Sequence, residues 1–83
     1  MNLKGQHVLI TGASGGVGQA LARKLHEAGA SLTLTDLDDA RGQELVASLS
    51  SRANFLIHDV SSPSDWTRVV SEAVKQQGPL TAV

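Results

Sequence analysis

Three glycines and one aspartate have the residue types and the spacing to hold a phosphorylated ligand: Gly12, Gly16, Gly18 and Asp36. The glycines follow a short apolar run, residues 8–10. Because glycine has no side chain, such a turn can be tight, can approach a pyrophosphate closely, and can let the next helix pack near the strand. The free N–H groups that open that helix favour the negative charge of phosphates. The spacing therefore predicts a dinucleotide site, with Asp36 accepting hydrogen bonds from an adenosine ribose.

Asp36 also bears on which dinucleotide the site would take. Its negative charge would repel a phosphate on the ribose, and Leu37 is not the arginine that a 2'-phosphate favours, so we expect NAD rather than NADP. Arg41, four residues after Leu37, could compensate. A nucleoside-triphosphate loop is not expected, because Gln19 and Ala20 follow the last glycine instead of lysine and a hydroxyl residue. The alternative is that the glycines only make a tight strand-to-helix connection.

The elements that must position these residues alternate along the chain in a β-α-β-α-β-α-β order. The expected strands are residues 7–11, 31–35, 54–58 and 80–83, and the expected helices are residues 16–28, a segment capped by Asp38 or Asp39, and a segment capped by Ser62. Right-handed crossovers then predict a Rossmann-type parallel sheet of order 3-2-1-4, with two helices on one face and the third on the other. The fold class is α/β, an incomplete doubly wound fold with the glycine turn at its ligand crevice.

Apolar periodicity predicts which side of each helix faces the sheet. The predicted inward residues are Val17, Leu21, Leu25 and Ala28 in the first helix, Leu45, Val46 and Leu49 in the second, and Trp66, Val69, Val70, Ala73 and Val74 in the third. Three histidines, His7, His26 and His58, lack the spacing of a metal site, and we expect them to be exposed or half-buried.

The composition bounds the class of protein. From a chain of 83 residues we expect one small domain, residues 1–83, and no second domain. A net charge of −1 gives no field to attract nucleic acid, and the N-terminal apolar run is too short for a signal peptide or a membrane span. The lack of cysteine excludes disulfides and thiolate metal sites and fits a reducing, cytoplasmic compartment.

The glycine turn resembles that of the short-chain dehydrogenase/reductase family. The family signature Thr-Gly-x-x-x-Gly-x-Gly is matched by Thr11, Gly12, Gly16 and Gly18, and Gly15 lets the same string match the extended branch of that family as well. The later residues resemble the non-extended branch, because a strand ending in Asp-Val is followed by a long helix and then by Gly-Pro-Leu.

The resemblance implies further roles around the cofactor. Asp59 would bind the adenine amino group, and the Val60 N–H a ring nitrogen of the same base. Ser14 would contact the adenosine ribose or phosphate, Val17 would bind the pyrophosphate through its N–H, and Leu37 would pack beside the adenine. In the complete protein the implied activity is hydride transfer between nicotinamide and an alcohol or carbonyl.

The chain departs from the family after its fourth expected strand. The family has an active-site serine and a Tyr-x-x-x-Lys motif whose tyrosine is the general acid/base, but this chain contains no tyrosine. We therefore assign no catalytic residue, and expect a fragment that is inactive alone. The alternatives are a non-catalytic nucleotide-binding module, or a non-functional fragment that self-associates through the exposed edge of its sheet.

Overall fold

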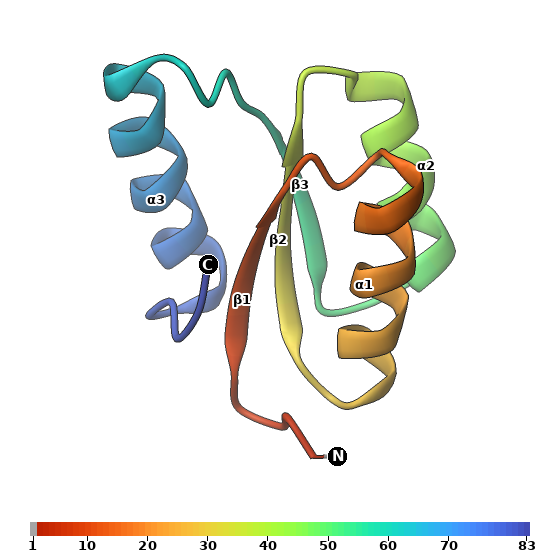
Figure 1. Ribbon diagram of the computed structural model, residues 1–83. Helices are drawn as coiled ribbons and strands as arrows, with labels where there is room; N and C mark the ends of the chain where they lie inside the picture. Colours follow the sequence, from red (N-terminus) through yellow and green to blue (C-terminus); the bar gives the residue numbers. More distant parts are fainter. Residues whose placement is uncertain (1) are drawn as a thin grey trace.

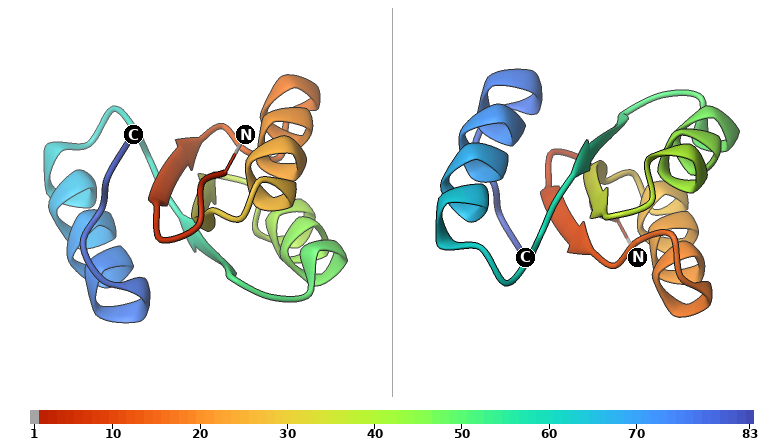
Figure 2. Two further views of the ribbon diagram at one scale, coloured as in Figure 1. Left: turned by 90° about the horizontal axis from the view of Figure 1, so that it is seen from below. Right: turned by 90° about the horizontal axis from the view of Figure 1, so that it is seen from above.

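The computed structural model describes residues 2–83 as strands and helices in strict alternation. The elements are β1 (His7–Thr11), α1 (Gly16–Glu27), β2 (Ser31–Asp36), α2 (Asp39–Leu49), β3 (Ala53–Ile57) and α3 (Pro63–Gln77). In Figure 1 the strands lie side by side, with α1 and α2 on one side of the sheet and α3 on the other. The views in Figure 2 agree on these three layers. The predicted α/β class and the predicted placement of the helices are confirmed.

The strands form one parallel sheet of order β1-β2-β3. In its register, Leu9 of β1 lies opposite Thr33 of β2, and Leu34 of β2 lies opposite Phe55 of β3. Residues 32–35 of β2 are all buried, as in a strand covered on both faces. The carboxyl ends of all three strands consequently meet at one edge of the sheet.

The predicted fourth strand is present only as a single parallel bridge between Val8 and Ala82. The Leu9 N–H donates to the Ala82 carbonyl at 3.0 Å, and the Thr81 N–H donates to the His7 carbonyl at 2.8 Å. The His7 N–H, however, donates to the Thr81 hydroxyl at 2.9 Å. A side chain thus takes the place of a main-chain carbonyl, so this segment lies beside β1 as predicted but does not form a regular strand.

Side-chain caps begin α2 and α3 at the predicted residues. Asp38 accepts a hydrogen bond from the Arg41 N–H at 3.1 Å, and the Ser62 hydroxyl accepts one from the Asp65 N–H at 3.3 Å. Both bonds satisfy N–H groups that the first turn of a helix leaves without a partner. α1 differs, because its N-cap is a glycine that has no side chain to offer.

Apolar side chains fill the space between the sheet and the pair α1 and α2. This core consists of Ile10, Ala13, Ala22, Ala30, Leu32, Leu34, Leu45, Leu49 and Phe55. Gly42 of α2 lies directly over the Phe55 ring, and a Cβ at that glycine would overlap the ring. The bare backbone of α2 therefore serves as the surface against which Phe55 packs.

The predicted apolar stripe of α1 is correct at Leu25, which packs against the core, and wrong in the first half of the helix. Val17 is 87% exposed and Leu21 is 46% exposed, whereas Ala22 is completely buried. The reason is the close approach of α1 to the end of β1 at Gly18, where a Cβ would meet the backbone of Ala13. One turn further along, the residue that faces the sheet is the small Ala22, and the side chains of Val17 and Leu21 turn outward.

The predicted inward side of α3 is only partly correct. Val69 and Ala73 are completely buried against the sheet, but Val70 and Val74 are exposed. Residues four apart lie on the same side of a helix, whereas the next residue along is turned by about 100°. A single helix on this face therefore buries a narrow stripe and leaves the neighbouring valines toward solvent.

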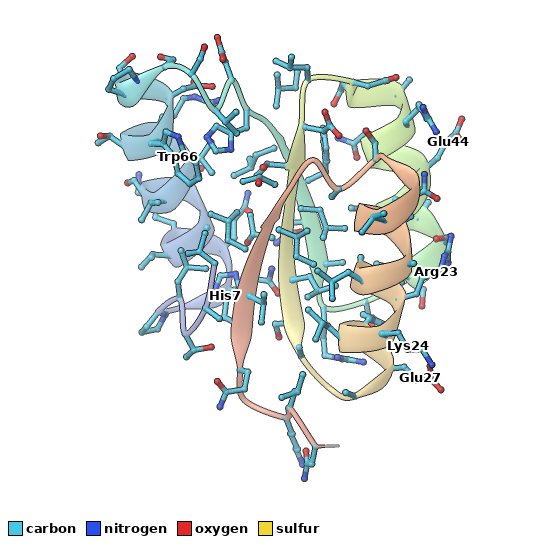
Figure 3. The ribbon with its side chains drawn as sticks, in the orientation of Figure 1. His7, Arg23, Lys24, Glu27, Glu44 and Trp66 are labelled. Atoms are coloured by element: carbon cyan, nitrogen blue, oxygen red, sulfur yellow. The ribbon has the colours of Figure 1, made fainter. Side chains whose placement is uncertain are left out.

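The prediction that the histidines are exposed or half-buried is wrong for His7 and His58, which are 3% and 2% exposed. The reason is that β2 supplies threonine partners beneath α3: Thr33 Oγ1 lies 2.7 Å from His7 Nε2, and Thr35 Oγ1 lies 3.0 Å from His58 Nδ1. His58 also packs edge-to-face on Trp66, with ring centroids 4.4 Å apart. Figure 3 shows His7 and Trp66 in this layer between α3 and the sheet.

Candidate dinucleotide-binding site

The turn from β1 to α1 leaves the start of the helix open. Gly12 has a φ of +65°, in the left-handed region that favours glycine, and its carbonyl accepts the Gly15 N–H at 3.2 Å. No acidic residue lies in the first turn of α1, and no side chain caps it. A Cβ at Gly16 would meet nothing within 4 Å, so there is free space beside the first residue of the helix. This open helix start fits a pyrophosphate.

Gly18 is required for a different reason from Gly16, because it lies against the backbone of the turn. A Cβ at Gly18 would overlap the Gly12 carbonyl oxygen and would lie 2.8 Å from the Ala13 Cα. Both clashes are with backbone atoms, which cannot move aside as the end of a side chain can. Gly18 therefore allows the close helix–strand contact that fixes the turn, while Gly12 and Gly16 shape its open side.

Asp36, at the end of β2, is held against this turn by Ser14. The Asp36 Oδ2 atom accepts the Ser14 hydroxyl at 2.5 Å and the Ser14 N–H at 3.1 Å, and Oδ1 accepts the Leu37 N–H at 2.7 Å. The Ala13 N–H donates to the Thr35 carbonyl at 3.0 Å, which ties the same turn to β2. The hydroxyl of Ser14 is thus engaged with the carboxylate.

The hydrogen bond from the Ser14 hydroxyl is the main reason why the pKa of Asp36 lies below its ordinary value. Burial of the carboxylate opposes this shift, and the Leu37 and Ser14 N–H groups and the positive charge of Arg41 add to it. Arg41 lies with Gln19, Arg23 and Glu44 around a surface hollow between α1 and α2. The carboxylate is therefore held ionised at the position where the sequence analysis places the ribose contact.

Because the folded protein lowers the pKa of Asp36, this group stabilises the fold above its unfolded pKa of about 3.9, and that contribution is lost as the pH falls through the lower, folded pKa. We expect the free energy of unfolding by urea to fall between about pH 5 and pH 2, and to fall less in an Asp36→Asn variant. Ser14→Ala should show the same reduced dependence. Equal pH profiles for the three proteins would contradict this assignment.

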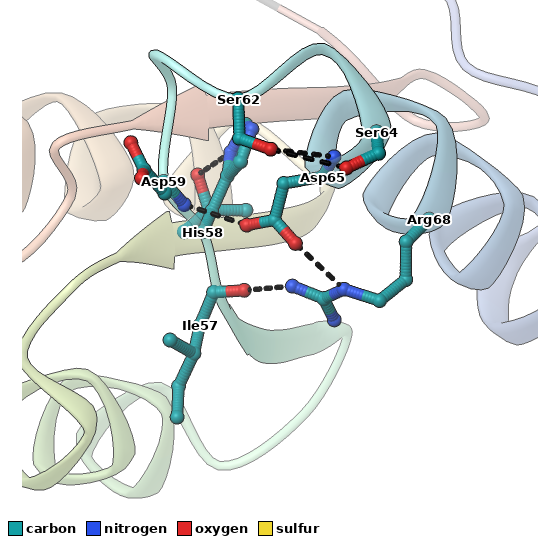
Figure 4. A network of polar contacts seen from close by, with 8 residues as sticks. Ile57, His58, Asp59, Ser62, Ser64, Asp65 and Arg68 are labelled. Carbon is teal, nitrogen blue, oxygen red and sulfur yellow. Dashed lines mark hydrogen bonds and ion pairs between the residues drawn. The ribbon is translucent and has the colours of Figure 1, made fainter.

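The third predicted contact region is the loop from β3 to α3. The Oδ1 atom of Asp59 accepts the Ser61 N–H at 3.0 Å and the Ser61 hydroxyl at 2.6 Å, and these bonds lower the pKa of Asp59. Val60 is exposed. The side chains of Asp65, Trp66 and Arg68 hold the main chain of this loop. Figure 4 shows the contacts of Asp65 and Arg68.

The predicted site residues thus divide into groups at the carboxyl ends of β1, β2 and β3, which lie at one edge of the sheet. Ser14 and Asp36 touch one another, whereas Asp59 and Val60 belong to the separate loop after β3. Leu37 is 69% exposed and offers an apolar surface beside Asp36. Ligands bind at this edge of open parallel sheets.

Some residues that hold the site have no recognisable pattern in the sequence. The Gln19 side-chain amide donates to the Ser14 carbonyl at 2.8 Å and so closes the turn from the helix side. Asp65 and Arg68 hold the loop after β3 through the Asp59 N–H and the Ile57 carbonyl. Nothing in their spacing marks these residues, because their partners are main-chain atoms of other segments.

Residues 2–83 contain no group of three or more histidine, cysteine, aspartate or glutamate side chains that could hold a metal ion. Within the same range, no helix is long and apolar enough to cross a membrane.

The parallel sheet, the helices on both of its faces and the glycine turn after β1 define an α/β protein of the Rossmann type. Residues 6–83 match the family described as short chain dehydrogenase. The chain therefore belongs to the short-chain dehydrogenase family, whose members are oxidoreductases.

Several characterised proteins are similar to almost the whole chain. The 3-beta-hydroxysteroid dehydrogenase of Comamonas testosteroni is 38% identical over 81 residues, which are 98% of this chain and 32% of that protein. The xanthoxin dehydrogenase of Arabidopsis thaliana is 39% identical over 83 aligned positions, covering 94% of this chain and 29% of the relative. Tropinone reductase-like 1 of Erythroxylum coca is 35% identical over 78 residues, covering 94% of this chain and 29% of that protein. The chain thus spans a third or less of the length of these relatives.

Proposed function

We propose that this chain is the cofactor-binding part of an NAD-dependent oxidoreductase. The observation that carries the proposal is the Asp36 carboxylate, fixed by two hydrogen bonds from Ser14 beside an open, glycine-lined helix start. A fixed carboxylate suits the two hydroxyls of a ribose and opposes a phosphate in their place, which supports NAD over NADP.

The remaining contacts follow the three loops at the carboxyl edge of the sheet. The pyrophosphate lies against Gly12 and Gly16 and accepts hydrogen bonds from the N–H groups at the start of α1, that of Val17 among them. The adenine packs beside Leu37, and its amino group and a ring nitrogen meet Asp59 and the Val60 N–H.

In the complete protein, the bound nicotinamide exchanges hydride with an alcohol or carbonyl substrate. A proton donor is needed for that step, and the tyrosine that supplies it in this family has no counterpart among the 83 residues. These residues therefore bind and orient the cofactor, and do not convert substrate by themselves. The absence of cysteine supports a reducing compartment such as the cytoplasm.

An Asp36→Ala variant tests this function. We expect NAD affinity to fall about tenfold, because hydrogen bonds to a charged group contribute about 1.5–3 kcal/mol, and we expect the preference for NAD over NADP to shrink by at least as much. Titration calorimetry with each dinucleotide measures both effects.

The matched control is Asp39→Ala, which removes a nearby exposed negative charge whose side chain bonds only Gln43 within the described residues. This variant should leave the preference unchanged. If Asp36→Ala keeps the preference for NAD over NADP, Asp36 does not contact the ribose. A lack of NAD binding to the unaltered protein would overturn the proposed function.

We also propose that the edge of β1, which residues 80–82 cover only from His7 to Leu9, pairs with a second copy of the 83-residue chain. Residues 80–82 add only one bridge to this edge, and Val8, Ile10 and Leu21 line an apolar hollow of about 260 Å³ there, together with the 78% exposed Val83. Unpaired strand edges associate with other chains. Light scattering should therefore give a mass of at least two chains, and a monodisperse monomer would contradict the proposal.

A further inference from the structure

The loop between β3 and α3 is held by side chains from one turn of α3. The Asp65 Oδ2 atom accepts the Asp59 N–H at 2.7 Å, and the Trp66 Nε1–H donates to the Val60 carbonyl at 2.9 Å. The Arg68 guanidinium donates to the Ile57 carbonyl. Three main-chain groups, one on each side of the Asp59 Cα and one at the end of β3, are therefore held from the same helix.

The three holding side chains also support one another. Arg68 Nε donates to the second Asp65 oxygen at 2.9 Å, which forms an ion pair and keeps both carboxylate oxygens engaged. Trp66 is fixed on its other side by the edge-to-face contact with the buried His58 ring, 4.4 Å away. Figure 4 shows the carboxylate of Asp65 between the Asp59 main chain and the Arg68 guanidinium.

The loop presents two polar groups outward. The Asp59 Oδ1 atom is taken by Ser61, and within residues 2–83 no hydrogen bond engages Oδ2 or the Val60 N–H. An acceptor and a donor on consecutive residues can recognise a purine edge only if the backbone between them is fixed, because fixed groups lose less entropy on binding.

We propose that Asp65 and Trp66 are positioning residues for adenine recognition: they fix the Asp59–Val60 main chain so that the Asp59 carboxylate and the Val60 N–H meet the base as a pair. This inference rests on the proposed NAD function. Arg68 acts one step further back, because it orients the Asp65 carboxylate. None of these three side chains touches the cofactor itself.

The proposed hydrogen bond between the Asp59 carboxylate and adenine can be tested with a dinucleotide that lacks the adenine amino group. The Asp59 carboxylate selects the amino group of adenine, which is absent from nicotinamide hypoxanthine dinucleotide. The useful quantity is the ratio of the dissociation constants of this analogue and NAD, measured by calorimetry. A merely structural role weakens both ligands equally and leaves the ratio unchanged, whereas a positioning role changes the ratio.

For the unaltered protein we expect a ratio of at least about ten, because hypoxanthine carries a carbonyl oxygen in place of the amino group and a hydrogen on N1, so the carboxylate loses its charge-assisted hydrogen bond from the amino group. Asp65→Ala should lower the ratio to about two or three by releasing the Asp59 main chain. Trp66→Phe keeps an aromatic ring beside His58, removes the N–H donor to Val60, and should lower the ratio in the same direction. This second variant decides the question if Asp65→Ala does not fold.

Thr67→Ala is the matched control, because Thr67 lies in the same turn and is exposed. Its ratio should equal that of the unaltered protein. Unchanged ratios in folded Asp65→Ala and Trp66→Phe, or an equal loss of affinity for both ligands, would overturn the positioning role. Asp59→Ala separates the two hypotheses: if this variant keeps a ratio of ten, the adenine contact in the proposed function is wrong, whatever the α3 variants do.

Discussion

Gly18→Ala is expected to destabilise the protein by about 3 kcal/mol and to abolish measurable NAD binding, although alanine is the better helix former. The added methyl group would overlap the Gly12 carbonyl oxygen and come within 2.8 Å of the Ala13 Cα. Since both are backbone atoms, α1 must move away from β1. That movement displaces the turn that holds Ser14 against Asp36, so the substitution lowers both the stability of the fold and the affinity of the site.

Gly16→Ala provides the contrast for this prediction. A methyl group at Gly16 meets nothing within 4 Å, so the free energy of unfolding should change by less than about 1 kcal/mol. The methyl group does, however, enter the space proposed for the pyrophosphate, so NAD affinity should fall about tenfold or more. Urea unfolding and calorimetric titration of both variants separate the two effects. Equal stability of Gly18→Ala and the unaltered protein would contradict the close helix–strand contact.

Gly42→Ala is the second substitution for which helix propensity and tertiary structure predict opposite changes in the free energy of unfolding. Position 42 lies inside α2, where replacing glycine by alanine should stabilise by about 1 kcal/mol on propensity alone. The new methyl group would overlap the ring of Phe55, which is enclosed in the core. Overpacking of this kind costs about 1–3 kcal/mol and occasionally more, so we expect a net loss of about 2 kcal/mol.

Urea unfolding of Gly42→Ala measures this loss, and the double variant with Phe55→Leu identifies its cause. Removing the ring gives the methyl group room, so the alanine should destabilise the Phe55→Leu background much less than the native one. Ala47→Gly, at an exposed position of the same helix, calibrates the propensity term at about 1 kcal/mol. A net gain of stability in Gly42→Ala would show that the ring moves aside without cost.

Much of the fold could be predicted because its signals are local. The apolar run of β1, the caps Asp38 and Ser62 and the turn glycines each act on residues a few positions away. Right-handed crossovers then leave one sheet order, which the pairing of β1, β2 and β3 and the position of the Ala82 bridge follow.

The predictions from sequence were wrong where contacts between distant segments determine which side chains are buried. The orientation of the first half of α1 depends on the contact between Gly18 and the end of β1, which turns Val17 outward and Ala22 inward. Burial of His7 and His58 depends on the threonines of β2, which provide hydroxyl partners under α3. Likewise, Thr81 interrupts the last strand by bonding the His7 main chain. None of these pairings has a periodic signature.

The sequence by itself determined the class of the protein, the order of its elements and the positions of its glycines and acidic residues at strand ends, because short-range sterics and chain connectivity control all three. Only the tertiary structure decided that Ser14 holds Asp36, that Asp65 and Trp66 hold the Asp59 loop, and that Gly42 receives the Phe55 ring. Each of these contacts joins groups from different elements, and their geometry exists only once those elements have packed.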